Sequence, residues 1–159
     1  MGAFAIELCM CSLDYAMKVF HYAPLTRLDV IVNSGYLRPS NAGASSERPL
    51  LWFSSNQKWE PTATKMLITP LGLKALSFEQ QASRFGCIRF GLDKDDLRLM
   101  SWKQACDVGE IKRDARRAME LYGRKRGAKS EHWHAVCANV SLSDMTFEIW
   151  KDHSWHQEN

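Results

Sequence analysis

The spacing of apolar residues changes several times along this chain, and each spacing predicts a different element. Between Pro24 and Gly35 the apolar residues recur at helical spacing, with the proline in the first turn and the glycine as a stop. A short apolar strand that ends near His21 precedes this helix. After a small polar loop, the run LLWFSS (50–55) predicts a second strand.

The rest of the chain predicts short helices and strands in alternation. Helices are expected at 61–67, at 77–86, where Ser77 and Gln80 have capping-box spacing, and at 111–123, where a glycine ends the apolar stripe. Strands are expected at 87–92, 97–102, 132–140 and 145–150, and an irregular stretch at 68–76. This order predicts an α+β fold, with residues 1–159 forming a single compact domain.

Composition is ordinary for a globular protein, with 45% hydrophobic and 25% charged residues among 159. No apolar stretch approaches the length of a membrane span, so we expect no membrane partner. Residues 1–17 are expected to form an N-terminal extension or a packed helix, because Glu7 and Asp14 argue against a secretory signal. Five scattered cysteines without a C-x-x-C spacing favour reduced thiols and a cytoplasmic location.

One pattern in residues 20–62 resembles a known superfamily. His21, Leu25, Leu28, Ile31, Gly35 and Leu37 carry the pattern His-x-x-x-Leu-x-x-Leu-x-x-Ile-x-x-x-Gly-x-Leu, and a strand that ends in two serines follows. This order resembles the first half of the ADP-ribosyltransferase superfamily, and most of all the DNA-targeting ADP-ribosyltransferase toxins and the RNA 2′-phosphotransferases. The resemblance implies split mixed or antiparallel sheets with flanking helices. It also implies a transferase that cleaves the nicotinamide glycosidic bond of NAD⁺ and moves ADP-ribose to a macromolecular acceptor.

The same resemblance implies roles for individual residues. His21 is expected to bind the nicotinamide ribose, and Ser54 and Ser55 to supply ordering hydroxyls. Trp59 or Tyr36 could stack on nicotinamide, and Arg38 and Arg84 are candidates for the pyrophosphate. Tyr22, beside the histidine, is a further expected NAD⁺ contact.

Cleavage of the glycosidic bond builds positive charge on the ribose, so the site also needs a carboxylate. In the toxin relatives this glutamate begins a late strand, and Glu131 matches that placement. Glu148 is the second candidate, because strand alternation puts Met145, Phe147 and Ile149 on the core face and Glu148 on the other.

Positive charge is concentrated late in the chain. Residues 112–129 hold eight basic and two acidic side chains, a net of +6, and the remainder of the chain carries −3. This separation favours a surface for a nucleic-acid backbone or an acidic protein, although a solvated helix face gives the same pattern. The residues proposed for this surface are Lys112, Arg113, Arg116, Arg117, Arg124, Lys125 and Arg126.

Other functional classes remain open at this point. The chain could be a catalytically inactive ADP-ribosyltransferase-like binding module or inhibitor that acts on a protein or nucleic-acid partner. An RNA 2′-phosphotransferase-like enzyme would instead rely on several Arg and His residues, for which the chain offers Arg38, Arg84 and Arg89. A zinc site would need the pairs His132–His134 and His153–His156 to meet, but surface histidines are favoured and no metal is expected.

Overall fold

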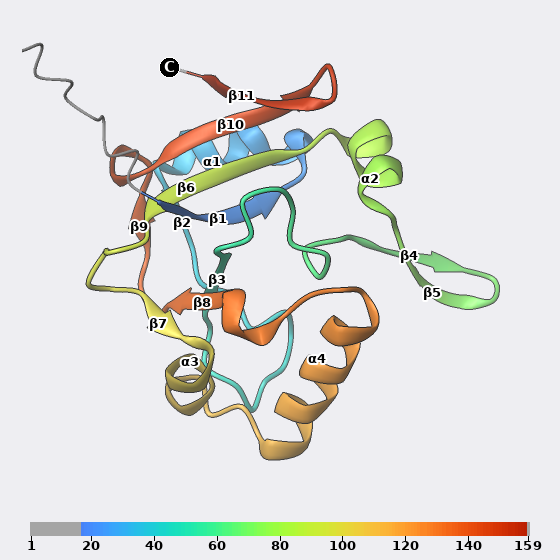
Figure 1. Ribbon diagram of the computed structural model, residues 1–159, viewed down its shortest axis with the longest axis vertical. Helices are drawn as coiled ribbons and strands as arrows, with labels where there is room; N and C mark the ends of the chain where they lie inside the picture. Colours follow the sequence, from blue (N-terminus) through green and yellow to red (C-terminus); the bar gives the residue numbers. More distant parts are fainter. Residues whose placement is uncertain (1–16, 159) are drawn as a thin grey trace, which may run out of the picture.

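The computed structural model describes residues 17–158, which form an α+β fold built on one seven-stranded antiparallel sheet (Figure 1). The sheet has the order β11-β10-β6-β1-β3-β8-β7, and two small two-stranded sheets, β2-β9 and β4-β5, accompany it. The helices are α1 (Leu28–Ser34), α2 (Phe78–Phe85), α3 (Trp102–Val108) and α4 (Arg113–Lys125). The strands are β1 (Lys18–Ala23), β2 (Tyr36–Leu37), β3 (Leu51–Ser54), β4 (Met66–Thr69), β5 (Gly72–Ala75), β6 (Ile88–Asp93), β7 (Met100–Ser101), β8 (Trp133–Val136), β9 (Val140–Ser141), β10 (Thr146–Lys151) and β11 (Ser154–Glu158).

The large sheet is almost divided in two between β1 and β3. β1 pairs with β6 over six residues, and β3 pairs with β8 over four. β1 and β3 themselves share a single register pair, Phe20 with Ser54. The sheet therefore consists of the halves β11-β10-β6-β1 and β3-β8-β7, which separate beyond this pair (Figure 1). The separation leaves room for side chains and for a cavity between the halves.

Two apolar cores pack against the large sheet. The apolar face of α1, with Leu28 and Ile31, packs against a core that includes Val19, Ile88 and Phe90. Gly35 ends this helix in the left-handed region (φ 74°), as its stop position predicts. A second core lies under the other half and joins Leu50, Ala105, Cys106, Ile111 and Ala135. The first core also takes in Leu51, Phe53 and Val136, so it crosses the division, whereas α3 and Ala115 of α4 pack on the second core.

Elements with strong local signals lie where the sequence predicts them. Ser77 caps α2 through a complete capping box with Gln80, and Gly86 ends that helix. β6 occupies the predicted strand, and β10 turns Phe147 and Ile149 to the core as its alternation predicts. The prediction of an α+β fold is confirmed. No helix within residues 17–158 is long and apolar enough to cross a bilayer. The expected N-terminal extension or helix covers residues 1–17, of which 1–16 lie outside the described range.

Several predicted elements are wrong. Residues 61–65 form a turn and irregular backbone rather than a helix. The hairpin made of β4 and β5 begins at Met66 and occupies most of the stretch that was expected to be irregular. The expected strand at 97–102 shrinks to β7, because Ser101 begins α3 with a capping box to Gln104. The expected strand at 132–140 is divided into β8 and β9, and β11 was not predicted.

Gly123 does not end α4, which continues to Lys125. A Cβ atom at this position would lie 2.6 Å from Cζ2 of Trp133. The glycine therefore allows close packing of α4 on the Trp133 indole, which the sequence pattern alone does not distinguish from a helix stop.

Candidate functional site

A cavity of about 600 Å³ opens where the sheet divides. Its walls come from β1, from β3, from the loop before β3, from the segment 60–65 and from α4. This volume lies within the range of small-molecule sites. The polar and charged residues of the wall are His21, Tyr22, Arg38, Ser40, Asn41, Glu47, Arg48, Ser54, Glu60, Thr62, Thr64 and Lys65; aromatic and aliphatic side chains, including Trp52, Trp102, Ile111, Met119, Tyr122 and Trp133, form the rest.

His21 lies in the gap between β1 and β3. Its Nδ1 atom is 2.8 Å from the carbonyl oxygen of Trp52. Because a carbonyl can only accept, Nδ1 must carry the proton, and in the neutral ring Nε2 is left as an acceptor. Burial lowers the pKa of His21, the bond to Trp52 opposes that shift, and the charge of Lys65 lowers the pKa further. His21 therefore presents a neutral ring, and among residues 17–158 its only hydrogen bond is the one at Nδ1.

A buried carboxylate shares this cavity. Glu60 is 4% exposed and accepts a hydrogen bond of 2.7 Å from the Ser54 hydroxyl. Its other oxygen accepts from the backbone N–H of Thr62 at 3.2 Å and from the Thr62 hydroxyl at 2.7 Å. Ser54 Oγ in turn accepts from the N–H of Asn56. Glu60 therefore fixes the turn after β3 and brings a carboxylate and two hydroxyls to the wall that also holds His21.

Three cations line the cavity. Arg38 lies over the ring of Tyr36, with its guanidinium carbon 4.9 Å from the ring centre, and donates to the Tyr36 hydroxyl at 3.2 Å. Arg48 forms an ion pair of 2.6 Å with Glu110, in which both side chains are largely exposed. Lys65 is close enough to His21 to influence its pKa. The cations come from two loops on the two sides of the cavity, a placement that suits an extended anionic ligand.

Three tryptophan rings form an aromatic part of the cavity wall. The rings of Trp52 and Trp102 lie 5.6 Å apart, and Trp102 meets Trp133 edge to face at 5.0 Å. The indole N–H of Trp102 donates to Glu120 of α4 at 2.6 Å. The Nε1 of Trp133 is buried and has no hydrogen-bond partner among the described residues. These rings offer flat apolar surfaces, while His21, Ser54 and Glu60 add polar groups to the same wall.

The structure brings together only part of the predicted site. His21, Tyr22, Arg38 and Ser54 line the cavity as expected. The other four predicted cofactor contacts do not line it: Tyr36, Ser55, Trp59 and Arg84.

Each of these four has a different role. The N–H of Ser55 extends the β3–β8 ladder to His132, and the ring of Trp59 packs against those of Tyr22 at 4.6 Å and Phe78 at 4.4 Å. Tyr36 supports Arg38, and the guanidinium of Arg84, on α2, lies over the neighbouring Phe85 ring. Trp59 and Tyr36 thus stand behind cavity residues rather than in the cavity wall.

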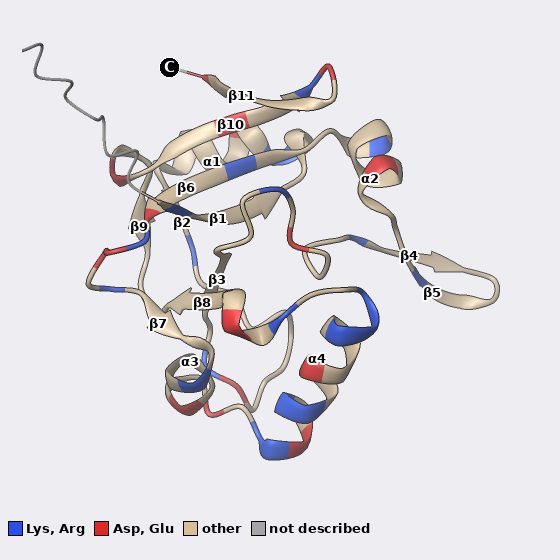
Figure 2. Ribbon diagram, viewed as in Figure 1, with Lys and Arg blue, Asp and Glu red and all other residues tan. Residues whose placement is uncertain are grey.

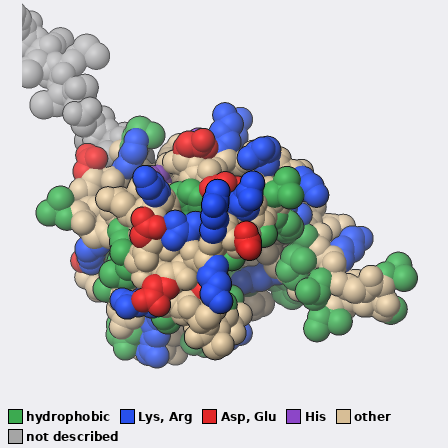
Figure 3. Space-filling model, turned by 90° about the horizontal axis from the view of Figure 1, so that it is seen from below, with side chains coloured by type: hydrophobic (Ala, Val, Ile, Leu, Met, Phe, Trp, Pro, Cys, Tyr) green, Lys and Arg blue, Asp and Glu red, His purple; other side chains and the backbone are tan. Residues whose placement is uncertain are grey.

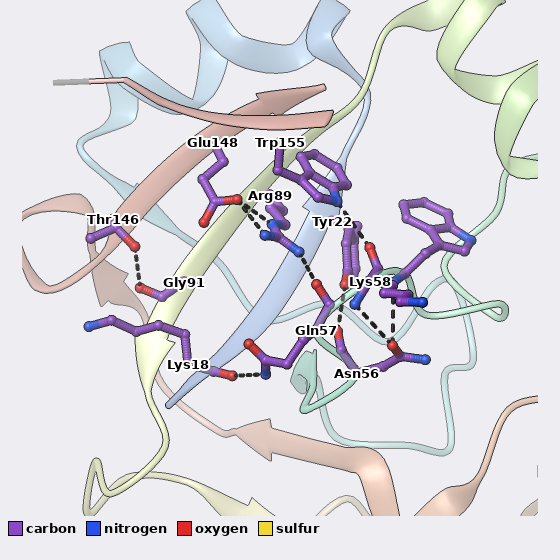
Figure 4. Close-up of polar contacts among 11 residues, drawn as sticks. Lys18, Tyr22, Asn56, Gln57, Lys58, Arg89, Gly91, Thr146, Glu148 and Trp155 are labelled. Atoms are coloured by element: carbon purple, nitrogen blue, oxygen red, sulfur yellow. Dashed lines mark hydrogen bonds and ion pairs between the residues drawn. The ribbon is translucent and has the colours of Figure 1, made fainter. Parts of the chain in front are cut away.

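Neither predicted catalytic carboxylate lines the cavity. Glu131 is exposed in the short 3-10 helix (Ser130–His132) that precedes β8. Glu148 accepts a hydrogen bond of 2.7 Å from Nε of Arg89 on the neighbouring strand (Figure 4). His21 is paired in register with Phe90, whereas Tyr22, Arg89 and Glu148 are paired across the sheet. Glu148 shares a sheet face with Tyr22 and Arg89, and Arg89 holds its carboxylate outside the cavity wall, so the structure does not bring it to the predicted site.

Sequence reasoning missed Glu60. One signal was present, because Glu60 is the only acidic residue between Glu47 and Glu79, in a stretch rich in apolar residues and hydroxyls. Glu60 stands directly before Pro61 and six residues after the strand-end Ser54. An acid in such a position has few charged neighbours in the chain, which is the signal that could have identified it. Its contact with Ser54 depends on the turn between them, which residue spacing does not reveal.

The four histidines cannot form one metal site. His132 and His134 lie at β8, whereas His153 and His156 lie in the β10–β11 hairpin. Four strands separate β8 from β11, a distance of about 24 Å at usual strand spacing. Residues 17–158 contain no cluster of three or more His, Cys, Asp or Glu side chains arranged for a metal.

The predicted basic surface is only partly available. Arg116 is used internally, because it donates to the carbonyls of Ile111 and Cys106 and to Asp107. Arg126 donates to the carbonyls of Pro61 and Leu76. The exposed members, which gather along α4 (Figures 2 and 3), are Lys112, Arg113, Arg117, Arg124 and Lys125.

If the exposed residues contact a nucleic-acid backbone, charge reversal should change the salt dependence of binding. Arg113 and Arg117 are four residues apart on α4 and share one face. The variant with both changed to Glu should flatten the slope of log affinity against log salt by about two, because fewer counterions are released. Fluorescence anisotropy with a labelled oligonucleotide across a salt series measures this slope. Lys94→Glu, an exposed cation outside α4, is the matched control, and equal slopes for both variants would leave α4 as a solvated face.

Comparison with protein-family models, with curated proteins and with solved structures finds no match to this chain.

Proposed function

We propose that the cavity binds NAD⁺ and that the protein is an NAD-dependent ADP-ribosyltransferase. The observation that carries this proposal is the arrangement around the divided sheet. A neutral His21 with an unpaired acceptor nitrogen shares one cavity with the hydrogen-bonded Ser54–Glu60 pair. An imidazole acceptor suits a ribose hydroxyl, which always has a proton to donate, and the carboxylate suits the positive charge that develops on the ribose.

The remaining wall suits the other parts of a dinucleotide. Arg38, Arg48 and Lys65 supply cations for a pyrophosphate, which both guanidinium and ammonium groups bind well. The aromatic part of the wall, with Trp52 and Trp102, offers flat surfaces for a base. These features support a ligand with two rings and a doubly charged centre.

In the proposed reaction, the bond between C1′ of the ribose and the nicotinamide nitrogen breaks, and its electron pair leaves with nicotinamide. A nucleophile on the acceptor then attacks C1′ and loses its proton. His21 would hold the ribose by accepting from one of its hydroxyls. Glu60, through its negative charge in a poorly solvated wall, would stabilise the ribosyl cation more strongly than an exposed carboxylate could.

A second candidate is a binding module that holds NAD⁺ without cleaving it. One observation favours it: both oxygens of Glu60 are already engaged by Ser54 and Thr62, and Glu131 and Glu148 do not line the cavity. The phosphotransferase alternative has weaker support, because only Arg38 among the three proposed arginines reaches the cavity and Arg89 is committed to Glu148.

One assay separates these candidates. The full chain is incubated with NAD⁺ labelled in the nicotinamide ring, and binding and nicotinamide release are measured on the same sample. Release supports the transferase, and saturable binding without release supports the binding module. Failure to bind NAD⁺ at all would refute both.

His21 offers a paired test of the binding geometry. In His21→Asn the side-chain amide can replace Nδ1–H as the donor to the Trp52 carbonyl, but no atom replaces Nε2. We expect NAD⁺ affinity to fall about tenfold or more with little change in stability, because a buried ligand hydroxyl loses its acceptor. Calorimetric titration measures the affinity, and thermal unfolding checks the fold.

His21→Gln is the matched variant, because its longer amide restores a polar group near Nε2 but gives up the bond to Trp52. We expect it to lose stability while keeping more affinity than His21→Asn. For the native chain, affinity should fall as the pH drops below the usual histidine range, because a protonated Nε2 no longer accepts. Unchanged affinity in His21→Asn would remove His21 from the site.

A further inference from the structure

The β4–β5 hairpin (residues 66–75) projects from the body of the fold and carries exposed aliphatic side chains (Figures 1 and 3). Ile68 is 90% exposed, Leu71 101% and Leu73 69%. Register pairs Ile68 with Leu73 and Met66 with Ala75, so one face of the hairpin is wholly apolar. Leu71 lies at the tip. An isolated apolar hairpin face is unusual in a protein that has two other packed cores, which indicates that something covers it.

Hydrogen bonds fix the hairpin at both its tip and its base. At the tip, the Thr69 hydroxyl donates to the carbonyl of Gly72 at 2.7 Å and accepts from the N–H of Leu71. At the base, Arg126 donates to the carbonyls of Pro61 and Leu76, on the two sides of the hairpin. The apolar tip is therefore held away from the fold by its own hydrogen bonds and by α4.

The surroundings of the hairpin are basic. No acidic residue occurs between Pro61 and Phe78, and this segment contains Lys65 and Lys74. α4 reaches the hairpin base, where the Tyr122 hydroxyl lies 3.9 Å from Sδ of Met66. The C-terminal turn of α4 and the loop after it add Arg124, Lys125 and Lys129, all exposed. An aliphatic tip thus projects beyond a group of cations, and the hairpin itself carries no acidic residue.

We propose that this hairpin docks the protein on an anionic membrane surface, with Ile68, Leu71 and Leu73 inserted among the lipids and the neighbouring cations on the head groups. A fluid bilayer accepts a convex apolar projection without a matching groove, and anionic lipids complement the lysines and arginines. The absence of a spanning stretch led us to expect no membrane partner, but docking on a surface needs only a short apolar insertion. This inference does not depend on the proposed transferase activity.

Other occupants fit less well. Nucleic-acid bases stack on aromatic rings, and the apolar face of the hairpin contains none. A second copy packed hairpin against hairpin would bring Lys65 and Lys74 of both chains together, and the segment between Pro61 and Phe78 has no acid to oppose them.

The test is co-sedimentation of the full chain with vesicles of phosphatidylcholine alone and of phosphatidylcholine with phosphatidylglycerol. We expect binding to the anionic vesicles, weakened by salt, and a loss of about tenfold or more in the vesicle partition coefficient of Leu71→Ser. Leu97→Ser is the matched control, because Leu97 is a leucine 102% exposed in a distant turn. Thermal unfolding verifies that each variant is folded.

Four results would overturn the proposal. The first is no partition into anionic vesicles, and the second is an equal loss in Leu71→Ser and Leu97→Ser. The third is a native chain that is dimeric in light scattering and becomes monomeric in Leu71→Ser, which would assign the hairpin to a second copy. Binding of a single-stranded oligonucleotide that is lost in Leu71→Ser, without vesicle binding, would assign it to nucleic acid.

Discussion

Replacing Glu148 with alanine is expected to lower the free energy of unfolding by about 3 kcal/mol or more. The guanidinium carbon of Arg89 lies 3.8 Å from the centre of the Phe20 ring and 4.4 Å from that of Trp155, and its side chain is only 9% exposed. Figure 4 shows Trp155 and Glu148 beside Arg89. Its Nη1 donates to the carbonyl of Gln57 at 2.7 Å, and Glu148 takes the remaining charge. Removing the carboxylate leaves a buried guanidinium without its counter-ion, which costs far more than the loss of an exposed pair. Urea unfolding measures the difference.

The neighbouring Lys151–Glu158 pair is a matched control in the same β10–β11 hairpin. Its side chains are 49% and 35% exposed, so Glu158→Ala should cost less than about 1 kcal/mol. Similar losses for the two variants would show that Arg89 is not an enclosed charge. A Glu148→Ala protein that stays fully stable but releases no nicotinamide would restore Glu148 as the catalytic carboxylate.

Local signals allowed part of this fold to be predicted. The helix that ends at Gly35 and the helix capped by Ser77 depend on residues within a few positions of one another. The alternation of β10 likewise identified its core face. These predictions succeed because the interactions that decide them join residues close together in the sequence. Such interactions do not change when the rest of the chain folds around them.

Local signals gave wrong predictions where contacts between distant parts of the chain determine the structure. Pro70 and Gly72 suggested an irregular stretch, but they lie at or beside the turn of the β4–β5 hairpin, where breakers are tolerated. Gly123 suggested a helix stop, but its role is to admit the Trp133 ring. The position of α3 was signalled by Ser101 and Gln104, a capping box that was not recognised.

The candidate site depended most on long-range register. His21 could be chosen from a strand-end pattern, but the gap that exposes it exists because β1 and β3 share one register pair. Glu148 was assigned correctly to the outer face of its strand, yet its carboxylate is held there by Arg89, beside the Trp155 ring, and does not line the cavity. Glu60 reaches Ser54 only through the turn between them. Pairing of this kind is not encoded in the spacing of one segment.

The second large effect is expected from removing the negative charge of Glu60, which should slow nicotinamide release. In Glu60→Gln, the amide oxygen can accept from Thr62 while the amide nitrogen donates to the Ser54 hydroxyl, so the hydrogen bonds of the turn are kept and only the charge is lost. Nicotinamide release should slow on the order of a hundredfold, with little change in NAD⁺ affinity, because the charge acts on the ribosyl cation and not on the ground state. Single-turnover assays and calorimetric titration measure the two quantities.

Glu131→Gln is the control, since it makes the same chemical change at an exposed carboxylate outside the cavity wall. It should slow nicotinamide release by less than about tenfold, because water screens an exposed charge. If Glu131→Gln is the inactive variant and Glu60→Gln is not, the short 3-10 helix before β8 must turn its carboxylate onto the ribose when NAD⁺ binds. Glu60 would then be a structural residue that holds Ser54 and Thr62, and the strand-start position inferred from the resemblance would be the catalytic one.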